Sequence, residues 1–368
     1  MKRLIFPVII VILNSITISG QNPIPKRGYF HLVGTINEDI QVTMELIKLN
    51  DSLYADYTCH FTDYNQKAYN IYYGSSQQLS GKMFTNNNFW LKKPISEKGP
   101  DLQGKFVNSS ELLGTWENSK GQKHPFKLNE KYPEGTVQFN LFYDKVVRKL
   151  VAKPKSPEAK IQLLVLLPAE SSNVILSDTL RTVIQKCFFG NNTLTASPEV
   201  LIGGMKDVFF ENYTNSNESL YKEMPDGGNF SWELLKYMHI VNNEGNLLTF
   251  SILSYAFTGG AHGLETQDFF SIDLLTGKII HLEDILKPDQ ENELNNLLTN
   301  KLRQMIGISG TQKLTESGYF VEKVKANENF YLTGNGLGFF FNHYELAPYS
   351  FGFTDIFLTF NELEGLIK

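Results

Sequence analysis

Residues 161–167 read Ile-Gln-Leu-Leu-Val-Leu-Leu, an apolar run with a single polar side chain. An apolar run of this length is typical of a strand that is buried on both faces. The residues after it have helical spacing over 177–188, with Ser177 or Asp178 as the cap, and again over 199–213. A doubly buried strand followed by helices predicts an α+β arrangement for this part of the chain.

The remaining residues on the C-terminal side mix strands and helices. Two strands, 231–242 and 247–257, flank Asn243-Glu244-Gly245-Asn246, and these residue types predict a hairpin turn. A helix is expected over 290–305, where leucines recur on one face. Further strands are expected at 269–273, 330–332, 338–341 and 355–360, before a short closing helix capped by Asn361. We therefore predict an α+β region over 135–368.

A different pattern precedes this region, from residue 28 to residue 132. Strand-forming segments alternate with turns, and within 41–46 polar and apolar side chains alternate as in a half-buried strand. The expected strands are 29–36, 40–49, 53–61, 69–73, 79–85, 89–93, 102–107 and 112–118. This spacing favours an all-β antiparallel domain, either a sandwich or a small barrel. The connection near 132–135 contains proline and glycine, and 136–147 reads as the next strand.

The first twenty residues have the order of a secretory signal. Lys2-Arg3 give a basic start, 4–13 are apolar, and 14–20 are small and polar. The alternative is a membrane anchor, but a spanning helix needs about 20 apolar residues. This run is shorter and contains Pro7. We predict cleavage near Gly20 and a periplasmic or secreted protein, with no transmembrane segment in the mature chain.

Composition narrows the classes of partner. The chain has 34 Lys and Arg against 39 Asp and Glu, a formal net charge of −5, and no cluster of basic residues. Such a balance argues against nucleic acid as a partner. Cys59 and Cys187 are the only cysteines, and we expect them to lie in different domains without a disulfide. No phosphate loop, dinucleotide fingerprint, nucleophile elbow or zinc-protease motif is present, so no cofactor and no catalytic residue is assigned.

Several short motifs in the last third form a more specific set. In chain order they occupy 255–263 (YAFTGGAHG), 270–278 (FSIDLLTGK), 282–285 (LEDI), 328–330 (ENF), 336–339 (GLGF) and 344–349 (YELAPY). In this order the set resembles the exported C-terminal domain, largely of unknown function, that RsiV-like anti-sigma factors and PdaC-like envelope proteins share. Residues 135–215 resemble the companion domain that usually precedes it, and 216–368 would be the C-terminal part.

The resemblance implies a location outside the cytoplasm and a binding role. In RsiV-like proteins the domain senses lysozyme by binding it, and in PdaC-like proteins it accompanies a separate deacetylase domain. This chain shows neither the sigma-binding segment of the first nor the deacetylase domain of the second. We therefore expect a non-catalytic envelope protein that binds a cell-wall glycan or a lysozyme-like protein.

The first candidate site is the glycine-rich loop that follows Tyr255. Gly259, Gly260 and Gly263 permit close backbone approach, and successive N–H groups in such a loop can hold an anion. His262 can act there as a base or a ligand. The simpler alternative is a tight turn in which the histidine hydrogen-bonds the backbone.

The second candidate site is Tyr344, Glu345 and Tyr349. A carboxylate between tyrosines suits contact with a sugar or a peptide, whereas the simpler alternative pairs Glu345 with a backbone group. If Glu345 and His262 are adjacent, they form an acid–base pair, and the alternative function is a hydrolase of cell-wall or polysaccharide material. His343 and Glu345 with His262 or His281 are conceivable zinc ligands, but their spacing is not diagnostic and no metal site is assigned.

Overall fold

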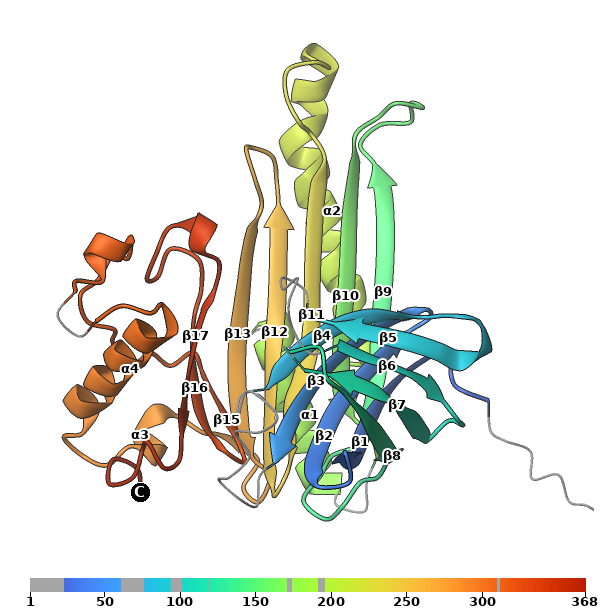
Figure 1. The fold of residues 1–368 in the computed structure, drawn as a ribbon. Helices are drawn as coiled ribbons and strands as arrows, with labels where there is room; N and C mark the ends of the chain where they lie inside the picture. The colour runs from blue at the N-terminus through green and yellow to red at the C-terminus, as the bar shows by residue number, and fades with distance from the viewer. Residues whose placement is uncertain are drawn as a thin grey trace, which may run out of the picture.

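The computed structural model describes residues 23–60, 76–93, 101–118, 120–170, 174–190, 196–309 and 312–368. Figure 1 shows three units: a β-barrel, a six-stranded sheet backed by helices, and a three-stranded sheet with a helix packed against it. The expected signal segment 1–20 and the expected strand 69–73 lie outside the described residues. Across the described ranges, no helix combines the length and apolar character needed to cross a membrane.

The N-terminal strands form a closed antiparallel barrel, which decides between the two architectures left open by the sequence. The strands are β1 (Arg27–Ile36), β2 (Ile40–Leu49), β3 (Ser52–His60), β4 (Gln77–Met83), β5 (Asn88–Lys92), β6 (Asp101–Phe106), β7 (Glu111–Glu117) and β8 (Lys123–Glu130). Each strand pairs with the next in sequence, and β8 closes the barrel on β1. The interior is filled by large side chains such as Trp116, Phe106 and Met44.

The sequence predicted β1 to β7 but missed β8. This strand contains Pro125, and a proline inside a run lowers the strand signal because it removes a ladder donor. The structure accommodates it because pairing with β1 begins one residue later, between Phe126 and Ile36. Pro125 therefore needs no N–H toward β1, and its carbonyl accepts from Asn37 instead.

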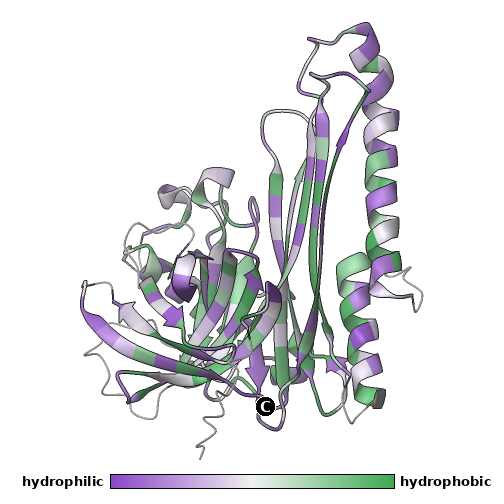
Figure 2. Ribbon diagram, turned by 90° about the vertical axis from the view of Figure 1, so that its right-hand side faces the viewer, coloured by the Kyte–Doolittle hydropathy of each residue, from purple (hydrophilic) through white to green (hydrophobic). Residues whose placement is uncertain are grey.

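The middle of the chain builds a six-stranded sheet in the order β14-β13-β12-β11-β10-β9. Its elements are β9 (Phe139–Lys149), β10 (Glu158–Pro168), α1 (Val174–Phe189), α2 (Pro198–Glu223), β11 (Trp232–Glu244), β12 (Leu247–Phe257), β13 (Leu264–Asp273) and β14 (Lys278–Ile279). Only β10 and β11 are parallel, and α1 and α2 form the crossover between them. Figure 2 shows both helices on one side of the sheet and the barrel on the other.

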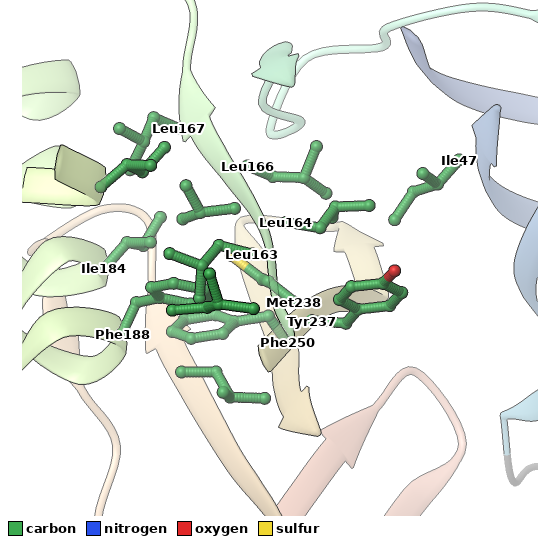
Figure 3. Packing of buried hydrophobic residues seen from close by; sticks show 14 of the residues in the cluster. Ile47, Leu163, Leu164, Leu166, Leu167, Ile184, Phe188, Tyr237, Met238 and Phe250 are labelled. Atoms are coloured by element: carbon green, nitrogen blue, oxygen red, sulfur yellow. The ribbon is translucent and has the colours of Figure 1, made fainter. Parts of the chain in front are cut away.

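β10 is buried on both faces, as its apolar run predicted. Leu163 and Leu167 point to α1, toward Ile184 and Phe188, whereas Leu164 points the opposite way toward Ile47 of the barrel (Figure 3). The helical layer and the barrel therefore share this strand as their common apolar surface.

The hairpin between β11 and β12 is confirmed. Gly245 and Asn246 both have positive φ, 63° and 62°, which is the backbone of a two-residue type I′ turn. α2 continues ten residues beyond the expected end at 213. Its last turns are polar, and Tyr221 anchors them by an edge contact with Phe230, 5.5 Å between ring centroids.

The C-terminal unit consists of β15 (Phe330–Thr333), β16 (Gly336–Phe341) and β17 (Thr354–Thr359), with α3 (Leu282–Ile285) and α4 (Glu291–Met305). The expected helix is α4, and its face of Leu294, Leu298 and Leu302 is buried against the three-stranded sheet. The expected closing helix at Asn361 is wrong, because 360–366 form consecutive turns. Gly365 has φ 86°, which is incompatible with helical continuation.

The domain bounds inferred from the sequence stay predictions. The barrel ends at Glu130 and the six-stranded sheet begins at Phe139. Residue 215, the expected boundary between the companion and C-terminal parts, lies inside α2, and the six-stranded sheet takes strands from both sides of it.

Both cysteine thiols are free. Burial raises the pKa of Cys59, in the barrel, to about 12 and that of Cys187, in α1, to about 11. Both side chains are therefore thiols rather than reactive thiolates near neutral pH.

Asn243 joins the barrel to the sheet by a buried polar contact. Its side-chain amide donates to the hydroxyl of Tyr29 at 2.8 Å and to the carbonyl of Val137 at 2.7 Å. Its carbonyl oxygen accepts from the N–H of Val137 at 2.8 Å. On the barrel strands β1 and β2, the Tyr29 hydroxyl donates to Glu45 at 2.5 Å, and Glu45 also pairs with His31 at 2.9 Å. One side chain thus holds three segments of the chain together.

We predict that Asn243→Ala lowers the free energy of unfolding by about 2–3 kcal/mol, because both backbone groups of half-buried Val137 and the Tyr29 hydroxyl lose their hydrogen bonds to Asn243. Urea unfolding followed by circular dichroism measures the change. Asn140→Ala is the matched control, since Asn140 is exposed on β9. A loss no greater than that of the control would contradict the structural role of Asn243.

Asp355 on β17 is a polar group of the three-stranded sheet, and it lies beside Tyr331 of β15. The Tyr331 hydroxyl contacts both carboxylate oxygens, at 2.9 and 3.1 Å. Desolvation nevertheless raises the pKa of Asp355 from 3.8 to about 6. Because the folded state holds the proton more tightly than the unfolded chain, this proton stabilises the fold at pH 4. That contribution is lost as the pH rises through about 6.

Asp355→Asn keeps an acceptor for Tyr331 and removes the titration. We expect the stability of this variant, relative to the unmodified protein, to increase from pH 4 to pH 7. Urea unfolding at both pH values measures it, with the exposed Asp226→Asn as control. A difference that does not change with pH would show that Asp355 does not titrate in this window.

Candidate functional site

The two candidate motifs meet on one surface. The glycine loop connects β12 to β13, and Tyr344 to Tyr349 follow β16. The rings of His262 and Tyr349 lie 4.8 Å apart between centroids, and those of Tyr344 and Tyr349 lie 5.8 Å apart. Segments about 80 residues apart in sequence, by their residue numbers, are thus brought into contact.

Glycine is required at different positions of this loop for different structural reasons. Gly259 and Gly260 adopt φ values of 101° and 94°, which side chains rarely allow. At Gly263, a Cβ would lie 2.4 Å from Cε2 of Tyr255. Only glycine lets the Tyr255 ring rest against the backbone here, so this contact gives the loop its shape.

His262 is exposed, and its ring is oriented by the loop. Nδ1 lies 2.8 Å from the carbonyl oxygen of Gly263 and donates to it when protonated. This bond favours the neutral tautomer that carries its proton on Nδ1, which leaves Nε2 as an acceptor facing away from that bond. The backbone hydrogen bond is the one named by the simpler sequence alternative.

Tyr344 is held in an unusual backbone conformation. Its φ is 69°, the left-handed region, which costs a bulky residue roughly 1–2 kcal/mol. The Glu345 carboxylate closes this turn by accepting from the N–H of Asn342 at 3.1 Å. Asn342 in turn accepts from the N–H of Gln267 at 2.8 Å, which attaches the turn to β13. Strain at an exposed tyrosine is a feature found at functional sites.

The surface also includes His343, which the sequence named only as a conceivable zinc ligand, and two phenylalanines that it did not single out. His343 stacks on Tyr349, with 4.1 Å between ring centroids, and lies tilted by 40° against Phe353 at 4.4 Å. Phe320 and Phe351 border the same loops, since Phe320 N–H donates to Leu346 and Phe351 contacts Tyr319. Three of these rings are strongly exposed: Phe320 at 55 %, Tyr344 at 51 % and Phe351 at 46 %. We call His262, Phe320, Tyr344, Tyr349 and Phe351 the aromatic patch.

The proposed acid–base pair is not assembled. Burial, together with the nearby charge of Asp268, raises the pKa of Glu345. However, within the described ranges no hydrogen bond or ion pair joins Glu345 to His262. His281 pairs with Glu328 at 3.6 Å instead of joining these residues. Among the residues that the structure describes, no group of three or more His, Cys, Asp or Glu could hold a metal ion.

The strain at Tyr344 gives a direct test of this geometry. We expect Tyr344→Asn to be more stable than Tyr344→Ala by about 1 kcal/mol, because both variants lose the ring but asparagine tolerates positive φ. Urea unfolding of the two variants measures the difference. Equal stabilities would mean that the turn does not impose this conformation.

Comparison with known proteins gives a family for part of the chain. Residues 283–361 match the model of a family described as "Protein of unknown function (DUF3298)". This range contains Tyr344, Glu345 and Tyr349 but not the glycine loop. No match was found among curated proteins. The grouping with RsiV-like and PdaC-like proteins, and the companion domain, stay predictions.

Two solved structures resemble this fold. A DUF3298 family member from Bacteroides fragilis has 24 % identity and a TM-score of 0.59, covering 63 % of this chain and 95 % of its own. A DUF3298 family protein from Pseudomonas aeruginosa has 17 % identity and a TM-score of 0.45, covering 63 % and 94 %. Residues 283–361 are therefore similar to the DUF3298 family, and the chain resembles the Bacteroides fragilis protein in fold.

Proposed function

We propose that the chain is exported and that its aromatic patch binds a cell-envelope glycan without altering it. The observation that carries this proposal is the set of exposed rings held in fixed positions by the turn at Tyr344 and the loop at His262. Exposed aromatic surface of this kind marks binding sites more often than chance. Because its turn is closed by hydrogen bonds, little ordering is needed on binding.

The chemistry of the patch suits a sugar. The exposed ring of Tyr344 offers apolar area to the C–H side of a pyranose ring, and Tyr349, which is itself stacked with His343, supports it. Nε2 of His262 and the carboxylate of Glu345 supply acceptors for its hydroxyl groups. A few polar groups beside aromatic rings are the usual composition of a small-ligand site.

Export is supported by the basic, apolar and small-residue order of residues 1–20. When the 368-residue chain is expressed in a bacterial host, we expect the released protein to begin at Gln21. Its intact mass measures this, and retention of the first twenty residues would contradict cleavage at this position.

Calorimetric titration of the protein beginning at Gln21 with soluble muropeptides tests the binding role. We expect saturable heat, and at least about a tenfold weaker affinity in Tyr344→Ala/Tyr349→Ala, because two stacking rings are removed. Phe84→Ala is the matched control, since that ring is 51 % exposed but lies on the barrel.

The recovered ligand and a second titrant distinguish the alternatives. Mass spectrometry of the muropeptide should show no change, whereas cleavage that depends on His262 and Glu345 would identify a hydrolase. Heat with lysozyme but none with muropeptides would replace the glycan by a protein partner. Equal binding by the double variant would remove the aromatic patch from the site.

A further inference from the structure

The six-stranded sheet ends in a long strand with a free edge. β9 has 11 residues, and among the described strands it pairs only with β10. Figure 1 shows it as the outermost strand of the sheet, on the side away from the C-terminal unit. Leu150, just beyond β9, donates its N–H to Pro157 on the β10 side. Lys145 instead donates its N–H to the carboxylate of Asp144 at 2.9 Å. Odd-numbered residues of β9 therefore direct their backbone groups outward, as a template for another strand.

The C-terminal half of β9 carries several cationic side chains. Asp144 is paired with Lys206 of α2, so its charge is compensated. Lys145, Arg148 and Lys149 remain, and the Arg148 guanidinium lies 3.9 Å from Asp207 with both side chains largely exposed. Such an exposed contact is worth little. Within the described part of the chain, Lys145 has no ion-pair partner.

Space for a bound side chain lies beside the end of β9. A cavity of about 430 Å³ opens between β9 and α2. Its walls include Arg148 and Lys149 from β9, and Phe210, Tyr213, Asp207 and Glu211 from α2. The Arg148 guanidinium lies 4.2 Å from the Phe210 ring centroid, and the buried Tyr213 hydroxyl has no hydrogen-bond partner. The cavity thus combines aromatic rings and two cations with the carboxylates of Asp207 and Glu211.

We propose that β9 accepts an extended acidic peptide segment of another protein as an added strand of this sheet. Main-chain hydrogen bonds to the outward groups of β9 would supply the affinity, and the cations would select the charge of the partner. In an antiparallel pair of two copies, the cationic C-terminal half of each β9 would lie opposite the uncharged N-terminal half of the other. A second copy would therefore leave these charges without partners, whereas an acidic segment would pair with them. The surface is distinct from the aromatic patch, so the two binding roles are independent.

Fluorescence anisotropy with a labelled peptide of alternating glutamate and valine, matched to the 11-residue length of β9, tests this inference. We expect saturable binding that weakens as salt is added, and none for the corresponding lysine–valine peptide. Val147→Pro should abolish binding, because it removes an outward N–H at a position where an edge strand tolerates proline. Lys145→Glu/Arg148→Glu should weaken it at least about tenfold.

The controls separate loss of binding from loss of fold. Val147→Pro should keep the urea midpoint of the unmodified protein. If the midpoint falls, the proposal is judged on the binding of Lys145→Glu/Arg148→Glu instead. Lys325→Glu, an exposed lysine of the C-terminal unit, should bind the peptide normally. Equal binding of both peptides, or binding unaffected by both β9 variants, would overturn the proposal. Dimers in sedimentation that Val147→Pro abolishes would assign the edge to a second copy instead.

Discussion

The architecture depends on β10 having apolar partners on both of its faces. A strand with leucines on both sides can be stable only when each face is covered, because each fully exposed leucine would cost roughly 1.5–3 kcal/mol. α1 covers one face through Ile184 and Phe188, and the barrel wall covers the other through Ile47. The crossover from β10 to β11 carries both helices to the same side, which leaves the opposite side for the barrel. The arrangement of the first two units follows from this requirement.

Elements with a strong local pattern could be predicted from the sequence. The apolar run of β10, the leucine face of α4 and the Gly245-Asn246 turn each contain their own structural reason. Elements that depend on contacts distant in sequence could not be predicted in this way. β8 is a strand because β1 and β7 pair with it despite Pro125. The closing helix is absent although Thr359 and Glu362 form a capping box, because Gly365 adopts a φ of 86° and ends the turns before a helix can continue.

The candidate site was likewise predicted only in part. Glycines and aromatic residues of unusual local sequence pointed to the loop at His262 and the turn at Tyr344, and the structure places them together. Phe320 and Phe351 carried no such signal, because exposure of an aromatic ring has no period and depends on which loops become neighbours. His343 was named only as a conceivable zinc ligand, not as part of this surface. Asn342 was also missed, since its role is to attach the turn to β13 rather than to contact a ligand.

The hydrogen bond between Asn243 and Tyr29 spans 214 residues of sequence and therefore bears on the order of folding. A chain is synthesised from its N-terminus, so the barrel strands are complete long before β11 is available. Until then, the hydroxyl of Tyr29 has only Glu45 and water as partners. Docking of the barrel onto the sheet therefore closes a loop of 214 residues, and the entropy of closing that loop opposes this contact more than it opposes the local hairpins of the barrel.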